Sequence, residues 1–123
     1  KYEKQIALNI QNPLSDSDKP LQTIVIENNS AKQVIYKLEL IKVTNSLSAE
    51  DNISYRLFRD NKLILDNQKL PTTDTTLLPK EIVNPHTKVT YQLFVYNSQL
   101  VTISQENKGV FIGTLWLKVN DKD

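Results

Sequence analysis

Apolar residues recur at every second position along most of this chain, and this pattern constrains the fold more than any other feature. Ile6, Leu8 and Ile10 share one side of the segment KQIALNIQ, and Ile24 and Ile26 do the same in QTIVIEN. Successive side chains of a strand point to opposite faces of a sheet, so a period of two indicates strands with one buried face. The sequence therefore predicts strands and needs no helix.

Five later segments show the same alternation: VIYKLELIKV (34–43), ISYRLF (53–58), KLIL (62–65), KVTYQLFVY (88–96) and GVFIGTLWLKV (109–119). About seven short strands separated by turn residues are typical of a two-sheet antiparallel β-sandwich, of immunoglobulin-like or jelly-roll type, with a small barrel as the alternative. We expect one such domain over residues 1–123 because the chain has the common size of one domain.

Details of the pattern predict local features. Ile35, Ile41 and Val43 lie on the parity opposite to Val34, Tyr36, Leu38 and Leu40, which indicates a β-bulge or a switch between sheets. Asp60 and Asn61 tolerate left-handed conformations and predict a hairpin turn. Three prolines in residues 66–87 predict a surface connection with at most a short strand near Leu77.

Leu93 and Leu115 lie at alternating apolar positions of their segments, and we expect both to face the core.

Composition excludes several classes of protein. The chain is 39% hydrophobic and 24% charged with a net charge of +1, which argues against disorder and against a broad attraction to nucleic acid. Its apolar stretches are far shorter than the roughly 20 residues that cross a bilayer, so no membrane span is expected. The absence of cysteine excludes disulfides, thiolate zinc sites and cysteine nucleophiles, but leaves the compartment undecided.

Asp16 and Asp18 are the weak candidates for a metal site, because they place two carboxylates on one short polar turn. An EF-hand loop would need a further oxygen ligand and then glycine, where this chain has Pro20 and Leu21. A looser calcium site stays open as an alternative. Asp and Ser in such a segment more often bond their own backbone, so we expect a turn and no metal or other cofactor.

Catalysis is not expected from this sequence. His86 is the single histidine, and it has no HExxH partner for a zinc protease centre. A serine triad would need a GxSxG elbow, which Gly109 and Gly113 do not form. We expect His86 to be a solvent-facing turn residue and the protein not to be an enzyme.

Trp116 lies on the parity opposite to Phe111, Leu115 and Leu117. On a one-sided sheet it would face outward, where an exposed tryptophan marks a contact surface. The alternative is a central strand whose outer face is covered by loops.

Four segments carry a resemblance to a known family: LNIQNPLSDSDKPLQTIVIENNSAKQVIYKLEL, YRLFRDNKLILDNQKLPTTDTTLL, IVNPHTKVTYQLFVY and GVFIGTLWLKV. Taken in order, they resemble the TasA/camelysin group of secreted proteins of Firmicutes. The similarity covers nearly the whole chain, and each motif is a strand pattern. Some relatives are described as metallopeptidases, but the absence of HExxH means that this activity does not transfer.

The resemblance implies an extracellular or cell-surface β-sandwich exported with a cleaved signal peptide. Some members polymerise into fibres or biofilm matrix by lending an N-terminal strand to a neighbour, which here would use Ile6, Leu8 and Ile10. The first strand and the resemblance together thus predict a structural subunit that self-associates by strand donation. The alternative is a monomeric surface module that recognises a peptide, a glycan or another surface protein.

Overall fold

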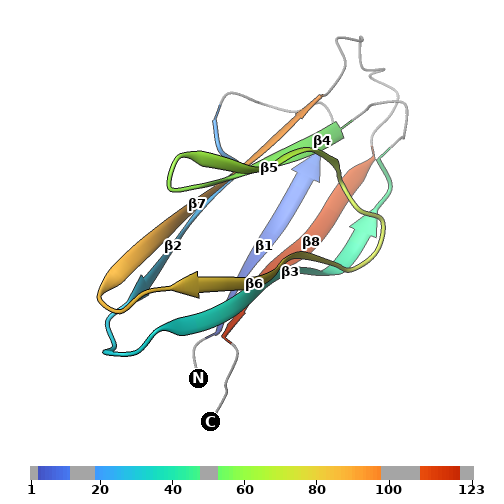
Figure 1. Cartoon of the computed structure of the whole chain (residues 1–123). Helices are drawn as coiled ribbons and strands as arrows, with labels where there is room; N and C mark the ends of the chain where they lie inside the picture. The colour runs from blue at the N-terminus through green and yellow to red at the C-terminus, as the bar shows by residue number, and fades with distance from the viewer. Residues whose placement is uncertain (1–2, 12–18, 48–52, 98–108, 120–123) are drawn as a thin grey trace.

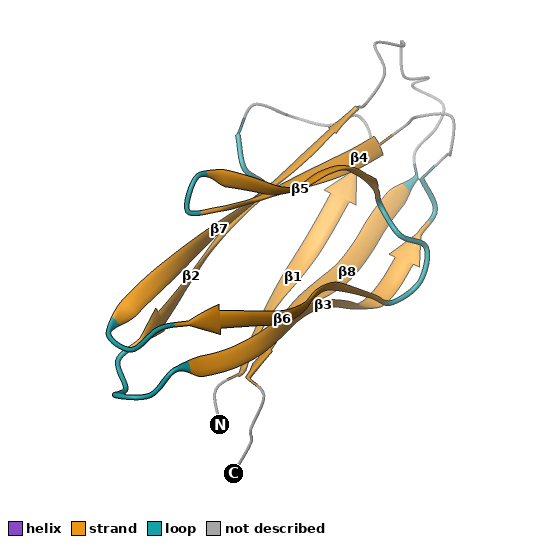
Figure 2. Ribbon diagram, viewed as in Figure 1, coloured by secondary structure: helices purple, strands orange, loops and turns teal. Residues whose placement is uncertain are grey.

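The computed structural model describes residues 3–11, 19–47, 53–97 and 109–119. These residues form eight strands and no helix (Figure 2): β1 (Glu3–Gln11), β2 (Gln22–Asn28), β3 (Val34–Asn45), β4 (Ile53–Arg59), β5 (Lys62–Lys69), β6 (Thr75–Val83), β7 (Thr87–Asn97) and β8 (Val110–Val119). Within these ranges there is accordingly no helix with the length and apolar character needed to span a membrane.

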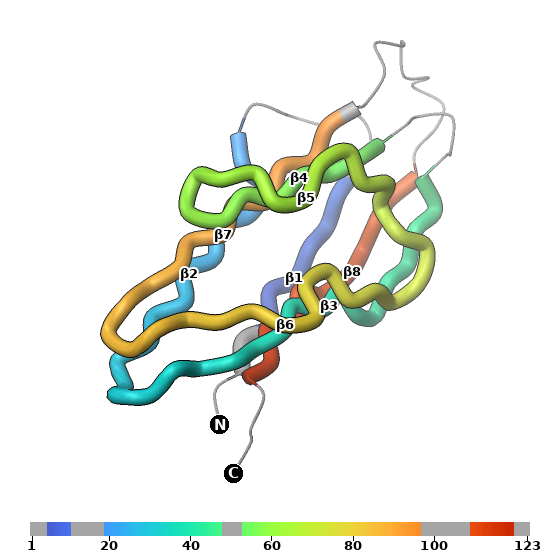
Figure 3. The backbone as a smooth tube through the Cα atoms, viewed as in Figure 1, coloured from blue at the N-terminus to red at the C-terminus, as the bar shows by residue number. Residues whose placement is uncertain are grey.

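The strands form two antiparallel four-stranded sheets. Sheet A has the order β1-β8-β3-β6, and sheet B has the order β2-β7-β4-β5 (Figure 1). The pairs are nested: β1 pairs with β8, β2 with β7, β3 with β6 and β4 with β5. The chain is thus one long hairpin folded over on itself, a path that Figure 3 traces. The predicted two-sheet sandwich is confirmed, and its nested pairing is that of a jelly roll.

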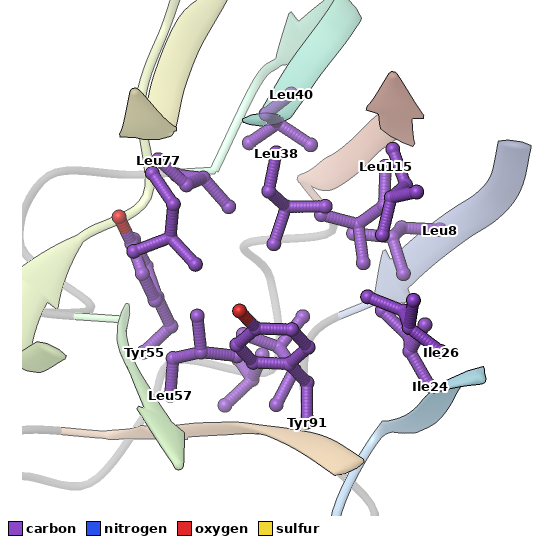
Figure 4. Close-up of a cluster of buried hydrophobic side chains, with 14 of the residues drawn as sticks. Leu8, Ile24, Ile26, Leu38, Leu40, Tyr55, Leu57, Leu77, Tyr91 and Leu115 are labelled. Atoms are coloured by element: carbon purple, nitrogen blue, oxygen red, sulfur yellow. The ribbon is translucent and has the colours of Figure 1, made fainter. Parts of the chain in front are cut away.

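The core lies between the sheets and uses the alternating apolar positions. Side chains of sheet A point toward side chains of sheet B in Figure 4, where the labelled residues include Leu8, Leu38, Leu40, Leu115, Ile24, Ile26, Leu57 and Tyr91. Leu93 and Leu115 are both buried, so the predicted inward faces of β7 and β8 are confirmed.

A bulge in β3 confirms the predicted change of parity. Lys42 has a φ of 55°, and the pairing of β3 with β8 shifts between Ile41 and Thr44. Leu40 is buried before the bulge, whereas Val43 packs against the core after it. The extra residue of a bulge reverses the parity of the side chains that follow, which explains why Val43 packs against the core although it is an odd number of residues from Leu40.

The turn between β4 and β5 is the predicted hairpin. Asp60 and Asn61 have φ values of 50° and 67°, as a two-residue type I′ turn requires. The turn also contacts β7, because the Thr90 amide donates to Asp60 Oδ1 at 2.9 Å and the Asp60 amide donates to the Thr90 carbonyl at 2.8 Å. These bonds fix the end of the hairpin on sheet B.

The structure has eight strands where about seven were expected. The prediction that residues 66–87 form a connection with at most a short strand near Leu77 was wrong. β5 continues to Lys69, and β6 is a strand of nine residues that contains Pro79. Proline cannot donate to a neighbouring strand, but β6 is an edge strand, where this loss is tolerated. The pairing of β3 with β6 is also irregular around Leu38, so this strand lacks a clean period of two.

Asn28 joins the two sheets at one end of the sandwich. Its buried Nδ2 lies 2.8, 3.0 and 3.2 Å from the carbonyl oxygens of Lys32, Val83 and Asn84. Its Oδ1 accepts hydrogen bonds from the amide and hydroxyl of Ser30 at 3.0 and 2.7 Å. One side chain of sheet B thus bonds the end of β6 in sheet A and shapes the turn that leads to β3.

Candidate contact surfaces

The three residues predicted to act in assembly lie on β1, an edge strand of sheet A. Leu8 and Ile10 are each only 3% exposed, and Ile6 is partly buried against the core. They lie opposite Leu115, Gly113 and Phe111 of β8 in an unbroken antiparallel register. In this structure β1 is therefore paired within its own chain, and it contributes to the core while hydrogen-bonding one neighbouring strand.

Gly113 of β8 lies directly opposite Leu8 of β1 and has no side chain that would fill the space between them. A Cβ at Gly113 would lie 3.2 Å from the Leu40 side chain and 3.3 Å from the Phe111 ring. Both neighbours are buried core residues, so a larger side chain would crowd the place where β1 docks. The φ of Gly113 is not positive, so its backbone conformation does not require glycine. Close packing is therefore the reason for a glycine here.

Trp116 lies on the outer face of β8, in the interior of sheet A. Its register partners are Gln5 of β1 and Glu39 of β3. The Lys118 ammonium lies 4.8 Å from the centre of the indole ring, and Lys37 pairs with Glu39 at 3.4 Å. The ring is half-buried, and its Nε1 is buried with no hydrogen-bond partner among the described residues. Charged side chains thus flank the indole of Trp116. Its strand, β8, lies in the interior of sheet A.

A group of aromatic side chains on the outer face of sheet B was missed by the sequence analysis. Phe58 and Phe94 form an edge-to-face pair with ring centres 5.5 Å apart. The Arg56 guanidinium lies 4.2 Å from the centre of the Tyr96 ring, whose hydroxyl donates to Asn67 Oδ1 at 3.1 Å. The signal was present, because aromatic residues occupy the outward parity of two neighbouring strands.

A polar cluster connects the sheets through Arg59, at the end of β4 in sheet B, and Glu81 of β6 in sheet A. Arg59 pairs with Glu81 and also donates to the Ile82 carbonyl at 2.7 Å. Glu81 Oε1 lies 3.4 Å from the Tyr91 hydroxyl, which in turn lies 2.5 Å from the Tyr36 hydroxyl. Burial raises the pKa of both tyrosines above their ordinary value. The cluster is internally satisfied and cross-links the two sheets.

The predicted metal candidates, Asp16 and Asp18, lie outside the described residues. His86 is exposed in the turn between β6 and β7, with a φ of 58°, as expected for a turn residue. In the part of the chain that the structure describes, no group of three or more histidine, aspartate or glutamate side chains is placed to hold a metal ion.

No protein family, no curated protein and no solved structure matches this chain significantly.

Proposed function

We propose that this protein is a secreted or cell-surface assembly subunit, a component of a fibre or biofilm matrix that joins neighbouring copies by exchange of β1. One observation carries the proposal: among the described strands β1 pairs only with β8, yet its Leu8 and Ile10 are buried in the core. The resemblance of the sequence to the TasA/camelysin group supports the extracellular setting.

Strand exchange requires no new surface chemistry. A neighbour's β1 would place Leu8 opposite Gly113 and Ile10 opposite Phe111, as the chain's own strand does. Identical contacts are exchanged between copies, and main-chain hydrogen bonds together with alternate side chains supply the affinity. A chain without its own β1 would have an open edge on β8 and exposed core residues.

The test is a chain that lacks residues 1–11, compared with the intact chain. We expect the intact chain to form fibres at high concentration in electron microscopy and the shortened chain to form none. The shortened chain should aggregate through the unpaired edge of β8, and a peptide of residues 1–11 should bind it and restore solubility. A peptide in which Leu8 and Ile10 are both replaced by serine is the matched control and should not bind.

Two results together would contradict strand donation. The first is the absence of fibres from the intact chain at every concentration. The second is protection of residues 4–11 from hydrogen exchange under the same conditions, which would show that β1 stays on its own sheet.

The second candidate function is a monomeric surface module that binds a peptide, a glycan or a protein. The aromatic group on sheet B favours it, because Phe58, Phe94 and Tyr96 with Arg56 place rings and a cation on one outer face. A discrete monomer that loses binding to its target on Phe94→Ser substitution would favour this function over assembly.

A further inference from the structure

Strand β2 forms a regular edge of sheet B, as β1 does of sheet A. All seven of its residues pair with β7 without a register shift, from Gln22 opposite Leu93 to Asn28 opposite Thr87. The edge strands β5 and β6 are different, because register shifts interrupt the pairing of both and Pro79 interrupts β6. Proteins commonly protect an edge with bulges, proline or charged side chains, especially lysine. The segment QTIVIEN has no bulge, proline or lysine, and its single charge, Glu27, lies near one end of the strand.

The solvent-facing side of β2 carries an apolar side chain at the centre of the strand. Val25 is 45% exposed, and Leu21, just before the strand, is 38% exposed. Ile24 and Ile26 on the opposite face are buried in the core. The core-facing side chains therefore anchor the strand, while its centre presents an exposed aliphatic side chain and an edge that pairs with no other described strand.

We propose that β2 pairs antiparallel with β2 of a second copy of this chain, about a two-fold axis at Val25. Symmetry then places Val25 against Val25, Thr23 against Glu27 and Ile24 against Ile26. Apolar residues meet apolar residues on both faces, and the threonine hydroxyl faces a carboxylate that can accept its hydrogen bond. No like charges are opposed.

Moving the two-fold axis by one residue in either direction gives a less favourable pairing of the two strands. An axis at Ile26 would oppose Val25 and Glu27, and an axis at Ile24 would oppose Val25 and Thr23. Each leaves the exposed valine against a polar side chain, whereas cross-strand apolar pairs are the favourable unit of sheet pairing. The edge is thus complementary to itself in one register, which identifies a second copy as the partner.

This interface is separate from strand donation, because it uses the edge of sheet B and leaves β1 in place. The experiment uses the full chain, whose lack of cysteine allows single cysteines to be read without background. Directly opposed residues have Cβ atoms about 4.5 to 5.5 Å apart, close to the geometry of a disulfide. Val25→Cys should therefore form a disulfide-linked dimer under mild oxidation.

Two controls make the result specific. Ile112→Cys lies on the outer face of sheet A and is 48% exposed, so it reports random collision between equally accessible thiols. Thr23→Cys lies on the same face of β2, but opposes Glu27 in the proposed register. We expect Val25→Cys to cross-link at least about tenfold faster than either control, and Thr23→Cys to cross-link efficiently when mixed with Glu27→Cys.

A substitution at the axis tests the same interface without cross-linking. Val25→Lys opposes two ammonium groups and should weaken dimerisation in sedimentation velocity by at least about tenfold, while Val25→Thr keeps a β-branched side chain and should retain it largely. Circular dichroism checks that both variants fold. Three results would each overturn the proposal. Val25→Cys could cross-link no faster than Ile112→Cys, or Val25→Lys could dimerise as well as the unmodified chain. Thr23→Cys could also cross-link faster alone than when mixed with Glu27→Cys.

Discussion

The hydroxyl groups of Tyr36 and Tyr91 lie 2.5 Å apart inside the core and join β3 of sheet A to β7 of sheet B. Both rings are almost fully buried and meet edge to face, with their centres 6.4 Å apart. A polar bridge therefore sits among aliphatic side chains. The bridge specifies which residues of the two sheets face one another, because a buried hydroxyl without a partner is costly.

Removing the hydroxyl of Tyr91 should lower the free energy of unfolding more than removing the hydroxyl of Tyr36. Tyr91→Phe leaves the Tyr36 hydroxyl without another described partner and should lower the free energy of unfolding by about 1 to 3 kcal/mol. Tyr36→Phe should cost less, since the Tyr91 hydroxyl still has Glu81 at 3.4 Å. The double variant should cost less than the sum of the two. Urea denaturation measures this, and additive effects would show that the hydroxyls are not coupled.

Alkaline pH should destabilise the fold through the same tyrosines. Burial raises the pKa of Tyr36 and of Tyr91, so both stay protonated in the folded state above pH 10, where the unfolded chain loses the protons. Their contribution is fully present below about pH 10 and is lost as the pH rises from there through the raised pKa values of the folded state. Denaturation at several pH values should show this loss, and the double phenylalanine variant should show a shallower one.

Truncation of inward-facing leucines should be costly. Leu93 and Leu115 are buried in β7 and β8, and replacing either by alanine should lower the free energy of unfolding by about 2 to 5 kcal/mol. Gln92 occupies the opposite parity of β7, so Gln92→Ala should cost about 0.5 kcal/mol or less. Equal losses of stability for Leu93→Ala and Gln92→Ala would contradict the assignment of Leu93 to the inward face of β7 and Gln92 to the outward face.

The Asn28 amide should not be replaceable by a carboxylate. Its Nδ2 points at the carbonyl oxygens of Lys32, Val83 and Asn84, so Asn28→Asp would put an acceptor against acceptors in a buried place. We expect a loss of about 3 kcal/mol or more in the free energy of unfolding, measured by thermal or urea denaturation. The exposed neighbour gives the control, since Asn29→Asp should change stability little.

Calcium and zinc should leave the stability of the protein unchanged. A bound ligand at 100 times its dissociation constant adds about 2.7 kcal/mol, which a melting curve detects easily. We expect no shift with either ion. An upward shift with calcium that disappears when Asp16→Asn and Asp18→Asn are combined would show that the polar turn is a metal site.

The sequence alone determined the character of most strands. Alternation of apolar residues assigned Leu8, Ile24, Leu57 and Leu93 to inward faces, because side-chain direction in a strand depends on local position alone. The chemistry of Asp60 and Asn61 likewise located a hairpin, since their left-handed conformations are a local property.

Only the tertiary structure decided which strands are neighbours. The pairing of Ile6 with Leu115 brings together distant parts of the chain, and no local pattern reports it. β6 was missed because Pro79 and an irregular register hide its period, and an edge position tolerates both. The contact of Arg59 with Glu81 follows from the way in which the two sheets stack, and the edge position of β2 follows from the order of the described strands in sheet B. Local sequence sets the faces of a strand, but the order of strands depends on long-range packing and hydrogen bonding between segments far apart in the chain.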